Sequence, residues 1–359
     1  MNKKSCIYIA GHGGLVGSAI LAALEKGGYE NILMRSSKEL DLTKQQDTLR
    51  FFEKHRPEYV FLAAAKVGGI YANNVYRADF LYPNVLIPFS VLSAAQKYGV
   101  KKLVFISSAC IYPKDPPQPI KEEALLTSPL EYTNEPHAIA KLAANKLCEA
   151  YNLQYGTNFL IAMPSNLYGV RDNFDLETSH VLPALFRKIY LGRALEGGDW
   201  GAIANDIARY PLNGLGGNAS KEEMLKALAE KGIEQGESGV SVTLWGDGTA
   251  KREFLWAGDF AKAAIFLMEK INFGDLHESG GEVRNTHINI GSGEELSSKA
   301  LALLIKDVLG FGGVFHFDAD KPNGVMRRFM NIEKMTKLGW QAETPLKKGI
   351  AKLAERYGV

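Results

Sequence analysis

The sequence GHGGLVG at residues 11–17 is the feature that most limits what this chain can fold into. It follows an apolar run, CIYIA, and precedes a segment with helical periodicity, SAILAAL. Gly11, Gly14 and Gly17 have the spacing that permits a tight turn, close approach of a pyrophosphate, and close packing of helix on strand. Glycines alone are also typical of ordinary turns, but their position between strand and helix predicts a dinucleotide-binding loop.

Short apolar runs alternate with helical segments through the first half of the chain. The strand candidates are CIYIAG, NILMR, YVFLAAA, LVFISS and FLIAMPS, and the helix candidates include SAILAALEKGG, QQDTLRFFEKH, PNVLIPFSVLSAAQKYG and AIAKLAANKLCEAYNLQYG. Nearly continuous apolar strands separated by helices are typical of a parallel sheet covered on both faces. With right-handed crossovers, the pattern predicts an α/β fold with a Rossmann-type, doubly wound parallel sheet.

The chain is too long for one small core, and its alternating pattern ends after about residue 165. We therefore expect a dinucleotide-binding domain and a smaller C-terminal lobe that binds substrate. The predicted domain covers residues 1–165 with a returning segment near 250–270, and the predicted lobe covers 166–249 and 271–359, including a Gly-rich, charged insertion at about 193–240.

Composition excludes several classes of partner. A net charge of +2 gives no concentrated basic face for nucleic acid. No apolar run approaches the roughly 20 residues of a bilayer span, and glycines interrupt the N-terminal stretch that would otherwise resemble a signal peptide. Cys6, Cys110 and Cys148 are few and lack metal-ligand spacing, which favours a cytoplasmic protein and predicts no metal site.

The end of the second predicted strand, NILMR, bears on the choice of dinucleotide. An Asp or Glu there would bind the ribose hydroxyl of NAD, whereas Arg35 can meet the 2′-phosphate of NADP. The alternative is a solvated arginine at a strand end. Asp41 and Leu42 follow, and we expect them to flank the adenine. NADP(H) is the predicted cofactor, and NAD(H) stays open.

A serine and a lysine follow at positions where this fold places its chemistry. The strand LVFISS brings Ser108 to the carboxyl edge of the sheet, and TNEPHAIAK begins a helix that carries His137 and Lys141 one turn apart. This arrangement resembles the reducing centre of the short-chain dehydrogenase/reductases, which have a Ser, a Tyr and a Lys in this order. In this chain His137 stands where the Tyr belongs.

A closer resemblance rests on seven motifs that occur together: GHGGLVGSAI, LAAAKVGGIYANN, SSACIYP, TNEPHAIAK, MPSNLYG, DNFDLETSHVLPAL and LWGDGTAKREFL. In this order they resemble the GDP-fucose synthase family, the GDP-4-keto-6-deoxymannose epimerase-reductases, over most of the chain outside the insertion. A bacterial branch acting on GDP-4-keto-6-deoxy-heptose is similar too. The resemblance implies NADP-dependent 3,5-epimerisation and 4-reduction of a GDP-4-keto-6-deoxy-sugar. It also implies a homodimer, built on the helix beginning at His137 and the one around residues 83–98.

The resemblance assigns catalytic roles by motif. Ser108 would hydrogen-bond the C4 oxygen of the sugar, and Lys141 would bind the nicotinamide ribose. Cys110 would remove the proton next to the carbonyl, and His180 would return a proton to the opposite face. A thiolate is a usable base once its pKa falls, and imidazolium is a suitable acid near neutral pH. The alternatives are a buried core cysteine and an ordinary histidine at a helix start.

The resemblance also implies ligand contacts. For the cofactor these are Gly11, Gly14, Leu15, Val16, Gly17, Arg35, Asp41, Leu42, Lys141, Pro164, Asn166, Leu167 and His180. For the GDP-sugar they are Lys188, Trp245, Arg252 and Asn323, although Trp245 could equally be a packing aromatic and Arg252 a surface charge. The chain departs from the family where Gly13 and Ser37 replace basic residues, which weakens the case for NADP over NAD. It also departs where Asn323 replaces a carboxylate near the substrate lobe.

The imidazole at position 137 changes the expected chemistry. Lysine and nicotinamide charges nearby would keep it neutral, and a neutral imidazole is a weaker acid than imidazolium and shorter than a phenol. Because positioned acid catalysis is typically worth about 10² to 10⁴ in rate, we expect a similar loss in reduction. Exchange of protons at carbon by Cys110 and His180 does not need the phenol, so epimerisation could outlast reduction.

The sequence also leaves two other hypotheses about function open. One is a non-catalytic dinucleotide-binding regulator that has lost its acid and kept the fold, although such a protein would not need Ser108, Cys110, Lys141 and His180 together. The other is a nucleotide-sugar epimerase or dehydratase that works at C4 through tightly held NAD, although that chemistry would not be expected to use a paired Cys and His.

Overall fold

The structure, a computed structural model, describes residues 1–237, 239–278, 280–321 and 325–359. The chain divides into two compact units, each assembled from three segments. Unit 1 comprises Met1–Arg171, Glu253–Glu294 and Phe329–Thr344, and unit 2 comprises Asp172–Arg252, Glu295–Arg328 and Pro345–Val359. The first division thus falls at residue 171, and unit 1 regains residues 329–344 in addition to a segment that includes 253–270.

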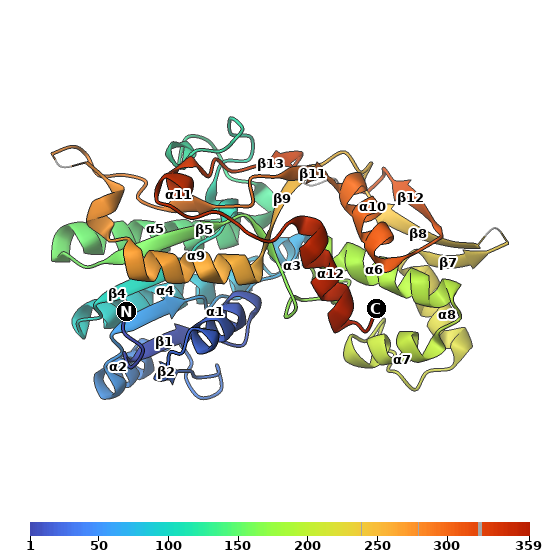
Figure 1. Cartoon of the computed structure of the whole chain (residues 1–359), viewed down its shortest axis with the longest axis horizontal. Helices are drawn as coiled ribbons and strands as arrows, with labels where there is room; N and C mark the ends of the chain where they lie inside the picture. The colour runs from blue at the N-terminus through green and yellow to red at the C-terminus, as the bar shows by residue number, and fades with distance from the viewer. Residues whose placement is uncertain (238, 279, 322–324) are drawn as a thin grey trace. The chain divides into compact units, whose positions relative to one another are not determined.

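Unit 1 is built on a six-stranded parallel sheet with the strand order β10-β5-β4-β3-β1-β2 (Figure 1). The strands are β1 (Ile7–Ala10), β2 (Ile32–Leu33), β3 (Tyr59–Leu62), β4 (Lys102–Ile106), β5 (Phe159–Pro164) and β10 (Ile288–Ile290). Because β1 lies between β2 and β3, the chain winds outward from it in both directions. The predicted doubly wound α/β fold is confirmed; β10 is an additional strand that the apolar pattern did not predict.

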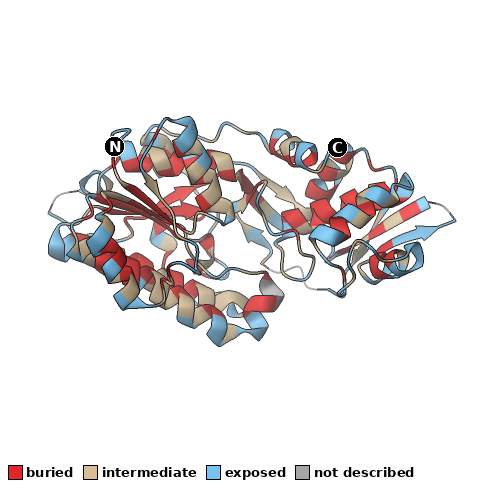
Figure 2. Cartoon of the chain, turned by 90° about the horizontal axis from the view of Figure 1, so that it is seen from below, coloured by how far each residue is buried: buried red, intermediate tan, exposed pale blue. Residues whose placement is uncertain are grey.

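Helices cover both faces of this sheet. They are α1 (Leu15–Lys26), α2 (Gln45–His55), α3 (Ile70–Val75), α4 (Arg77–Lys97), α5 (Glu135–Tyr155), α9 (Ala257–Lys270) and α11 (Glu333–Lys337). In β1, Ile7 and Ile9 pack in a core cluster with α1 and α9, whereas Tyr8 and Ala10 pack in a second cluster with α2, α4 and α5. The strands are therefore buried on both sides, as Figure 2 shows for the sheet.

Unit 2 contains a smaller sheet and a group of helices. Its strands β7 (Ile233–Gly236), β8 (Gly239–Trp245) and β12 (Val314–Asp318) pair in the order β12-β8-β7. Its helices are α6 (Val181–Glu196), α7 (Trp200–Arg209), α8 (Lys221–Glu230), α10 (Ser298–Leu309) and α12 (Leu346–Arg356). The predicted insertion at 193–240 supplies the end of α6, both α7 and α8, and β7. Ser220 and Glu223 form a capping box that starts α8.

Three short strands complete the two units. In unit 1, β6 (Asn166–Tyr168) pairs in parallel with Phe254–Trp256, the second half of β9 (Lys251–Trp256). In unit 2, β13 (Arg327–Arg328) pairs with the first two residues of β9, and β11 (Glu295–Ser297) leads into α10. These pairings fix the ends of β9, which holds Arg252.

A buried ion pair ties the insertion to the core of unit 2. Arg187 of α6 and Asp206 of α7 are both buried, and the guanidinium Nε donates to Asp206 Oδ1 at 2.8 Å. Arg187 also donates to the carbonyl oxygens of Phe174 and Tyr210. Because the guanidinium donates to three oxygens at once, its buried charge is compensated within the protein, and the ion pair holds α7 against α6.

Among the described residues, α4 alone is long and apolar enough to span a membrane by length and composition. The same composition suits a core helix, and its residues Val91, Leu92, Ala94 and Ala95 pack in the sheet core of unit 1. The sequence pattern did not indicate a membrane span because prolines and polar residues interrupt the apolar run of α4.

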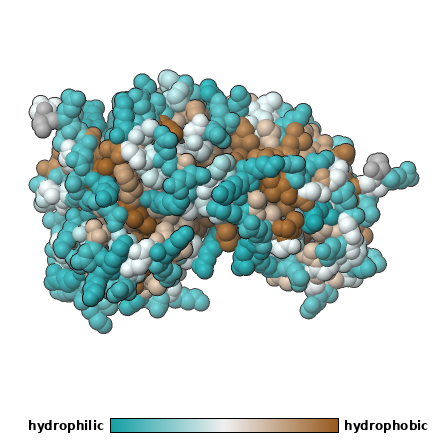
Figure 3. Space-filling model, viewed as in Figure 1, coloured by the Kyte–Doolittle hydropathy of each residue, from teal (hydrophilic) through white to brown (hydrophobic). Residues whose placement is uncertain are grey.

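On the face of the molecule in Figure 3, hydrophobic residues form separate patches among hydrophilic ones.

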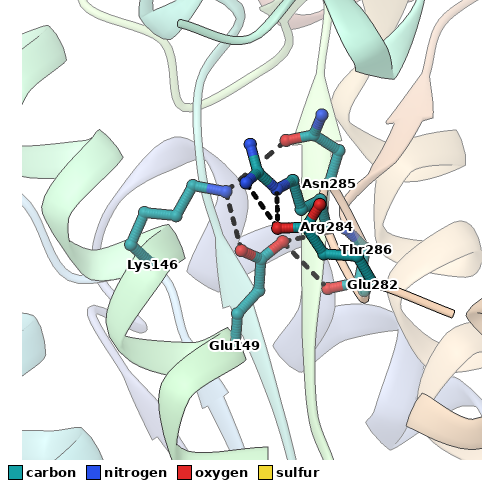
Figure 4. Close-up of polar contacts among 6 residues, drawn as sticks. All are labelled: Lys146, Glu149, Glu282, Arg284, Asn285 and Thr286. Atoms are coloured by element: carbon teal, nitrogen blue, oxygen red, sulfur yellow. Dashed lines mark hydrogen bonds and ion pairs between the residues drawn. The ribbon is translucent and has the colours of Figure 1, made fainter. Parts of the chain in front are cut away.

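The second half of α5 is tied to the segment that leads into β10 (Figure 4). The buried carboxylate of Glu149 accepts hydrogen bonds from Thr286, at 2.9 Å from its backbone N–H and 3.3 Å from its hydroxyl. Lys146 lies 2.7 Å from the other carboxylate oxygen and also reaches Asn285. This network fixes the helix that carries His137 and Lys141 in its first turns.

Candidate active site

The glycine loop is packed too tightly against the backbone for side chains at Gly11 and Gly17. A Cβ on Gly17 would lie 2.1 Å from the carbonyl oxygen of Gly11, and one on Gly11 would lie 2.7 Å from Ala64 N. Gly11 also has a φ of +89°, which side chains disfavour. In the part of the chain that the structure describes, no side chain caps α1, which begins after Gly14. The first N–H groups of α1, those of Leu15, Val16 and Gly17, therefore belong to an uncapped helix N-terminus, the kind of site that binds a pyrophosphate.

Three predicted cofactor contacts, Arg35, Asp41 and Leu42, follow β2, and each has contacts within the protein. Arg35 donates from Nη1 to the carbonyl oxygen of Met34 at 2.6 Å, and its guanidinium carbon lies 5.7 Å from the ring centroid of Phe51. The carboxylate of Asp41 accepts hydrogen bonds from Thr43, at 3.0 Å from its N–H and 2.6 Å from its hydroxyl, which stabilises the turn before α2. The side chain of Leu42 is buried in the core of unit 1.

Lys141 is buried with its ammonium group against the end of β4. Nζ donates to the carbonyl oxygen of Ile106 at 2.7 Å and lies 4.8 Å from the ring centroid of Phe105. Desolvation lowers the pKa of Lys141 to about 8, and the nearby Cys110 acts in the opposite direction. The ammonium of Lys141 and the thiol of Cys110 are therefore close enough to interact electrostatically.

Ser108 and Cys110 lie just beyond the carboxyl end of β4, and both are half-buried. Ser108 is the N-cap of a short 3₁₀ helix, Ala109–Ile111, and its Oγ accepts the N–H of Cys110 at 3.4 Å. Because the oxygen lone pair accepts this bond, the hydroxyl hydrogen can be donated to another oxygen. The structure thus brings Ser108, Cys110 and Lys141 together at one edge of the sheet, which is the arrangement that the motifs imply.

A buried polar network supports the segment that carries Cys110. The hydroxyl of Tyr112 donates to Asn289 Oδ1 at 2.6 Å and lies 2.8 Å from Nε2 of His287. Because the phenol has given its hydrogen to Asn289, His287 must supply the N–H in the second contact. Burial lowers the pKa of His287 to about 3, so the ring stays neutral. The network anchors the chain two residues after Cys110.

His137 is half-buried in the first turn of α5, one turn before Lys141. Its Nδ1 lies 3.1 Å from Nδ2 of Asn84, which projects from α4. Asn84 is itself held by the backbone of Lys66, whose N–H donates to Oδ1 and whose carbonyl oxygen accepts from Nδ2, both at 2.8 Å. The imidazole therefore has a fixed neighbour on the side away from Nε2.

The end of β5 contributes the remaining predicted cofactor contacts of unit 1. Pro164 is the last residue of β5, and after Ser165 the residues Asn166 and Leu167 begin β6. Asn166 is exposed and donates from Nδ2 to the carbonyl oxygen of Glu253 at 2.9 Å, whereas Leu167 packs at the margin of the core. All three lie near carboxyl ends of parallel strands, where this fold binds its ligands.

In unit 2, two predicted residues lie on the first half of α6. His180 is exposed at the N-cap, where its carbonyl oxygen accepts the N–H of Ala184 at 3.1 Å. Lys188 donates from Nζ to the carbonyl oxygen of Thr243 at 2.7 Å. Desolvation, followed by the charge of Lys231, lowers the pKa of Lys188 to about 8. An anionic ligand would relieve this cost, which is consistent with a contact to a diphosphate.

Trp245 and Arg252 lie on neighbouring parts of unit 2. The side chain of Trp245 is exposed at the end of β8, and Nζ of Lys321 lies 5.7 Å from its ring centroid. Arg252 is aligned with Arg328 of β13, and desolvation followed by this second charge lowers the pKa of Arg252 to about 10. Paired guanidinium groups favour an anion. The predicted contact Asn323 lies outside the described residues.

The sequence pattern gives little or no sign of several residues around the site. Asn84 carries a weak signal, because it is a polar residue within the apolar helix PNVLIPF. His287 and Asn289 alternate with apolar residues in THINIG, which is typical of a strand with one polar face. Their contacts with Tyr112 and Glu122 join parts of the chain more than 150 residues apart, and local patterns do not contain that information.

Comparisons with known proteins agree with this geometry. The model of the NAD dependent epimerase/dehydratase family matches residues 7–203 and 209–291. The chain is 42% identical over 356 residues to GDP-L-fucose synthase 1 of Arabidopsis thaliana, covering 99% of this chain and 94% of that protein. It is 39% identical over 349 residues to GDP-L-fucose synthase of Escherichia coli strain K12, covering 97% and 95%.

Solved structures give the same picture. A GDP-6-OMe-4-keto-L-xylo-heptose reductase from C. jejuni has a TM-score of 0.92 and 40% identity, covering 100% of this chain and 99% of that one. A GDP-mannoheptose C4 reductase from Campylobacter jejuni, solved with NADP bound, has a TM-score of 0.86 and 40% identity, covering all of both chains. The resemblance predicted from the motifs is confirmed, and the chain belongs to the NAD dependent epimerase/dehydratase family, among relatives of the GDP-L-fucose synthases.

Proposed function

We propose that this chain is an NADP(H)-dependent enzyme that epimerises a GDP-linked 4-keto-6-deoxy-sugar and reduces it slowly at C4. The observation that carries the proposal is the grouping of Ser108, Cys110 and Lys141 at the carboxyl end of β4. A hydroxyl donor, a thiol and a buried ammonium at this edge suit a ketone whose neighbouring carbon loses a proton. Relatives named as GDP-L-fucose synthases over nearly the whole chain support it.

The cofactor is NADP(H), which supplies hydride to C4 when bound. The uncapped N-terminus of α1 after Gly14 suits its pyrophosphate, and we assign Lys141 to the nicotinamide ribose. Support for NADP comes from relatives solved with it, such as the C4 reductase from Campylobacter jejuni. Arg35 is the residue of this chain that we assign to the 2′-phosphate.

In the proposed epimerisation, the thiol of Cys110 provides the base. Cys110, as the thiolate, takes the proton from the carbon next to the C4 ketone, and Ser108 donates its hydroxyl hydrogen to the oxygen as negative charge develops there. Lys141 lowers the cost of the thiolate by its positive charge. His180, in its proposed role, returns a proton to the opposite face of the ring.

The residue at position 137 determines how fast the ketone is reduced in the proposed reaction. The alkoxide that forms at C4 needs a donor, and a neutral imidazole is a poorer one than the phenol that the superfamily uses there. The direct test is His137→Tyr, followed by NADPH absorbance with GDP-4-keto-6-deoxymannose. We expect consumption to rise by about 10² to 10⁴-fold. His137→Phe is the matched control, because it adds a ring of similar size without the hydroxyl; no rise with Tyr would contradict the proposed origin of slow reduction.

A second measurement separates the enzyme from a non-catalytic regulator. In D₂O, the sugar should take up deuterium at C3 or C5 in the presence of the protein. Cys110→Ser should reduce this uptake by a factor of about 10² or more, because the base is lost. Uptake that does not depend on Cys110, or no uptake at all, would favour the regulator.

A GDP-heptose is a second candidate substrate. The observation that favours it is structural likeness to two GDP-heptose reductases over the full chain, with TM-scores of 0.92 and 0.86. Comparing kcat/KM for a GDP-4-keto-6-deoxy-hexose and the matching heptose, with the His137→Tyr variant, decides between them. The substrate with the higher value is the one the site accommodates.

We further propose that the protein is a cytoplasmic homodimer that pairs through α4 and α5. Tyr82 and Phe89 of α4 are seven residues apart and exposed, so they share one face of that helix. Ile139, Leu153 and Tyr155 of α5 are exposed as well. An apolar strip on two adjacent helices suits a four-helix interface between two copies.

A further inference from the structure

We propose that Asn84 is a positioning residue that fixes His137 as a neutral imidazole with its hydrogen on Nε2. The result is a ring that donates a hydrogen bond at the site without carrying a positive charge. The proposal rests on the proposed function only where it gives that hydrogen bond a target, the C4 oxygen of the sugar. The tautomer itself can be measured without substrate.

The amide of Asn84 has a single allowed orientation. Its Oδ1 accepts the backbone N–H of Lys66 at 2.8 Å, and its Nδ2 donates to the carbonyl oxygen of Lys66, also at 2.8 Å. Flipping the amide would set donor against donor and acceptor against acceptor at the same two positions. The assignment of oxygen and nitrogen is therefore determined by the backbone of Lys66, which cannot change its own roles.

The second hydrogen of Nδ2 then determines the state of His137. Asn84 Nδ2 lies 3.1 Å from Nδ1 of the ring, and an amide nitrogen can only donate. Nδ1 must accept, so it carries a lone pair, and in a neutral ring the hydrogen is on Nε2. This nitrogen is on the opposite side of the ring from Asn84.

The surroundings also oppose a charged ring. Protonation of Nδ1 would place an N–H against the N–H of Asn84. Lys141 lies one turn along α5, and its ammonium is close to Cys110 of the 3₁₀ helix packed on α5. At the start of α5, Glu135 forms an ion pair with Arg77 at 3.6 Å, so its charge is partly compensated. Lys66 directs its ammonium towards Phe80, 5.3 Å from the ring centroid.

A neutral donor suits one half of the proposed reaction better than the other. Epimerisation passes through an enolate, which is stabilised when Nε2–H of His137 donates a hydrogen bond to the C4 oxygen of the sugar. The hydrogen itself need not be transferred. Quenching an alkoxide requires the hydrogen to move, which would leave an imidazolate. Asn84 therefore biases the site towards exchange at carbon and away from reduction.

The first experiment uses the wild-type protein with ¹⁵N-labelled histidine. Long-range ¹⁵N–¹H spectra distinguish a ring nitrogen that carries a hydrogen from one that carries a lone pair. The signals of His137 are identified by their absence from the His137→Tyr spectrum. We expect a lone pair on Nδ1 and hydrogen on Nε2 at pH 7, unchanged at pH 6. Hydrogen on Nδ1, or on both nitrogens, at pH 7 would overturn the proposal.

The second experiment reverses the role of Asn84. In Asn84→Asp, a carboxylate oxygen faces Nδ1 and accepts, so the ring should hold hydrogen on both nitrogens at pH 6. The rate of NADPH consumption in this variant should rise about tenfold from pH 8 to pH 6, a part of the full effect of positioned acid catalysis. In a folded variant, unchanged ¹⁵N signals would contradict the proposal.

A double variant separates positioning from a general effect on folding. In the His137→Tyr background there is no imidazole for residue 84 to orient, so adding Asn84→Asp should not produce the rise at pH 6. The same rise in both backgrounds would show that residue 84 acts elsewhere. If the sugar is not turned over at all, the proposed substrate is wrong, and the ¹⁵N signals still decide the tautomer.

Discussion

At the scale of single residues, the buried ammonium of Lys141 connects stability with pH. An unfolded lysine titrates near about 10.4, whereas burial lowers the pKa of Lys141 to about 8 in the folded chain. Between these values the unfolded chain binds more protons, so raising the pH favours the folded state. Below pH 8 both states are protonated and the cost of burying the charge is constant.

This yields a prediction for the protein without cofactor. The free energy of unfolding of the wild type, measured relative to Lys141→Met, should rise by about 3 kcal/mol as the pH increases from 8 to above 10. Urea unfolding of both proteins at unit steps of pH from 7 to 11 measures it, and other titrations cancel in the difference. A difference that does not change with pH would show that Lys141 is not buried as a cation.

Gly13 is one of two positions at which the family resemblance implies a basic residue that this chain lacks, and a Cβ there would meet nothing within 4 Å. We expect Gly13→Arg to raise the preference for NADPH over NADH by about 10-fold, because one charge-assisted hydrogen bond to phosphate is worth about 1.5–3 kcal/mol. Gly13→Gln is the neutral control. Titrating both dinucleotides by fluorescence gives the ratio, and an equal gain with Gln would exclude a charge effect.

At the scale of elements, the glycine loop determines how α1 meets β1. A Cβ at residue 17 would meet the backbone of Gly11, whereas one at residue 13 would meet open space. We therefore expect Gly17→Ala to destabilise the fold by about 1–3 kcal/mol and to weaken NADPH binding by about tenfold or more. Gly13→Ala, the matched control, should change stability by less than about 0.5 kcal/mol. Thermal unfolding and cofactor titration measure both, and equal effects would contradict the steric argument.

The network at the second half of α5 gives another prediction. Glu149→Ala should destabilise the protein by about 1–3 kcal/mol, because Thr286 would lose its acceptor in a buried position. Lys146→Ala removes only the half-exposed partner of the same carboxylate, so about 0.5 kcal/mol is expected. Urea unfolding compares the two variants. Similar losses would mean that the charge pair, not the backbone contact, holds the helix.

The sequence predicts those strands and turns whose formation depends on residues close together in the chain. Strands with apolar runs, such as Ile7–Ala10 and Lys102–Ile106, and the turn at Gly11 follow from local pattern and spacing. β10 did not, because it has three residues in a stretch of alternating polarity and owes its place to pairing with β5. The contact of Asn84 with His137 spans 53 positions, so only the fold reveals it.

The candidate site was predictable to a similar extent. Ser108, Cys110 and Lys141 share motifs that imply a common chemistry, and the structure brings them together. From the sequence, the state of His137 follows only from nearby charges, whereas in the structure its contact with Asn84 specifies the tautomer that we propose. A resemblance transfers roles between matching positions; it does not describe the neighbours of a residue that has been replaced.

At the scale of the whole molecule, the exposed apolar residues of α4 and α5 predict a dimer. Phe89→Asp combined with Ile139→Asp should convert it to a monomer, because two charges per copy would be buried at the interface. Light scattering after gel filtration measures the mass. Val314→Asp in unit 2, which also replaces an exposed apolar residue, is the control and should stay dimeric. A monomeric wild type, or a dimeric double variant, would contradict pairing through these helices.

The division into interleaved segments has a consequence for biosynthesis. The polypeptide passes between the units five times, at residues 171, 252, 294, 328 and 344. One edge strand of the large sheet, β10, is translated some 120 residues after its neighbour β5. On the ribosome, neither unit can therefore fold before later segments of the chain have been made. The units cannot fold one after the other during synthesis, as is common in multidomain proteins. Neither unit can reach its native state until residues beyond 328 have been made, and until then the edge of β5 that pairs with β10 is open to aggregation.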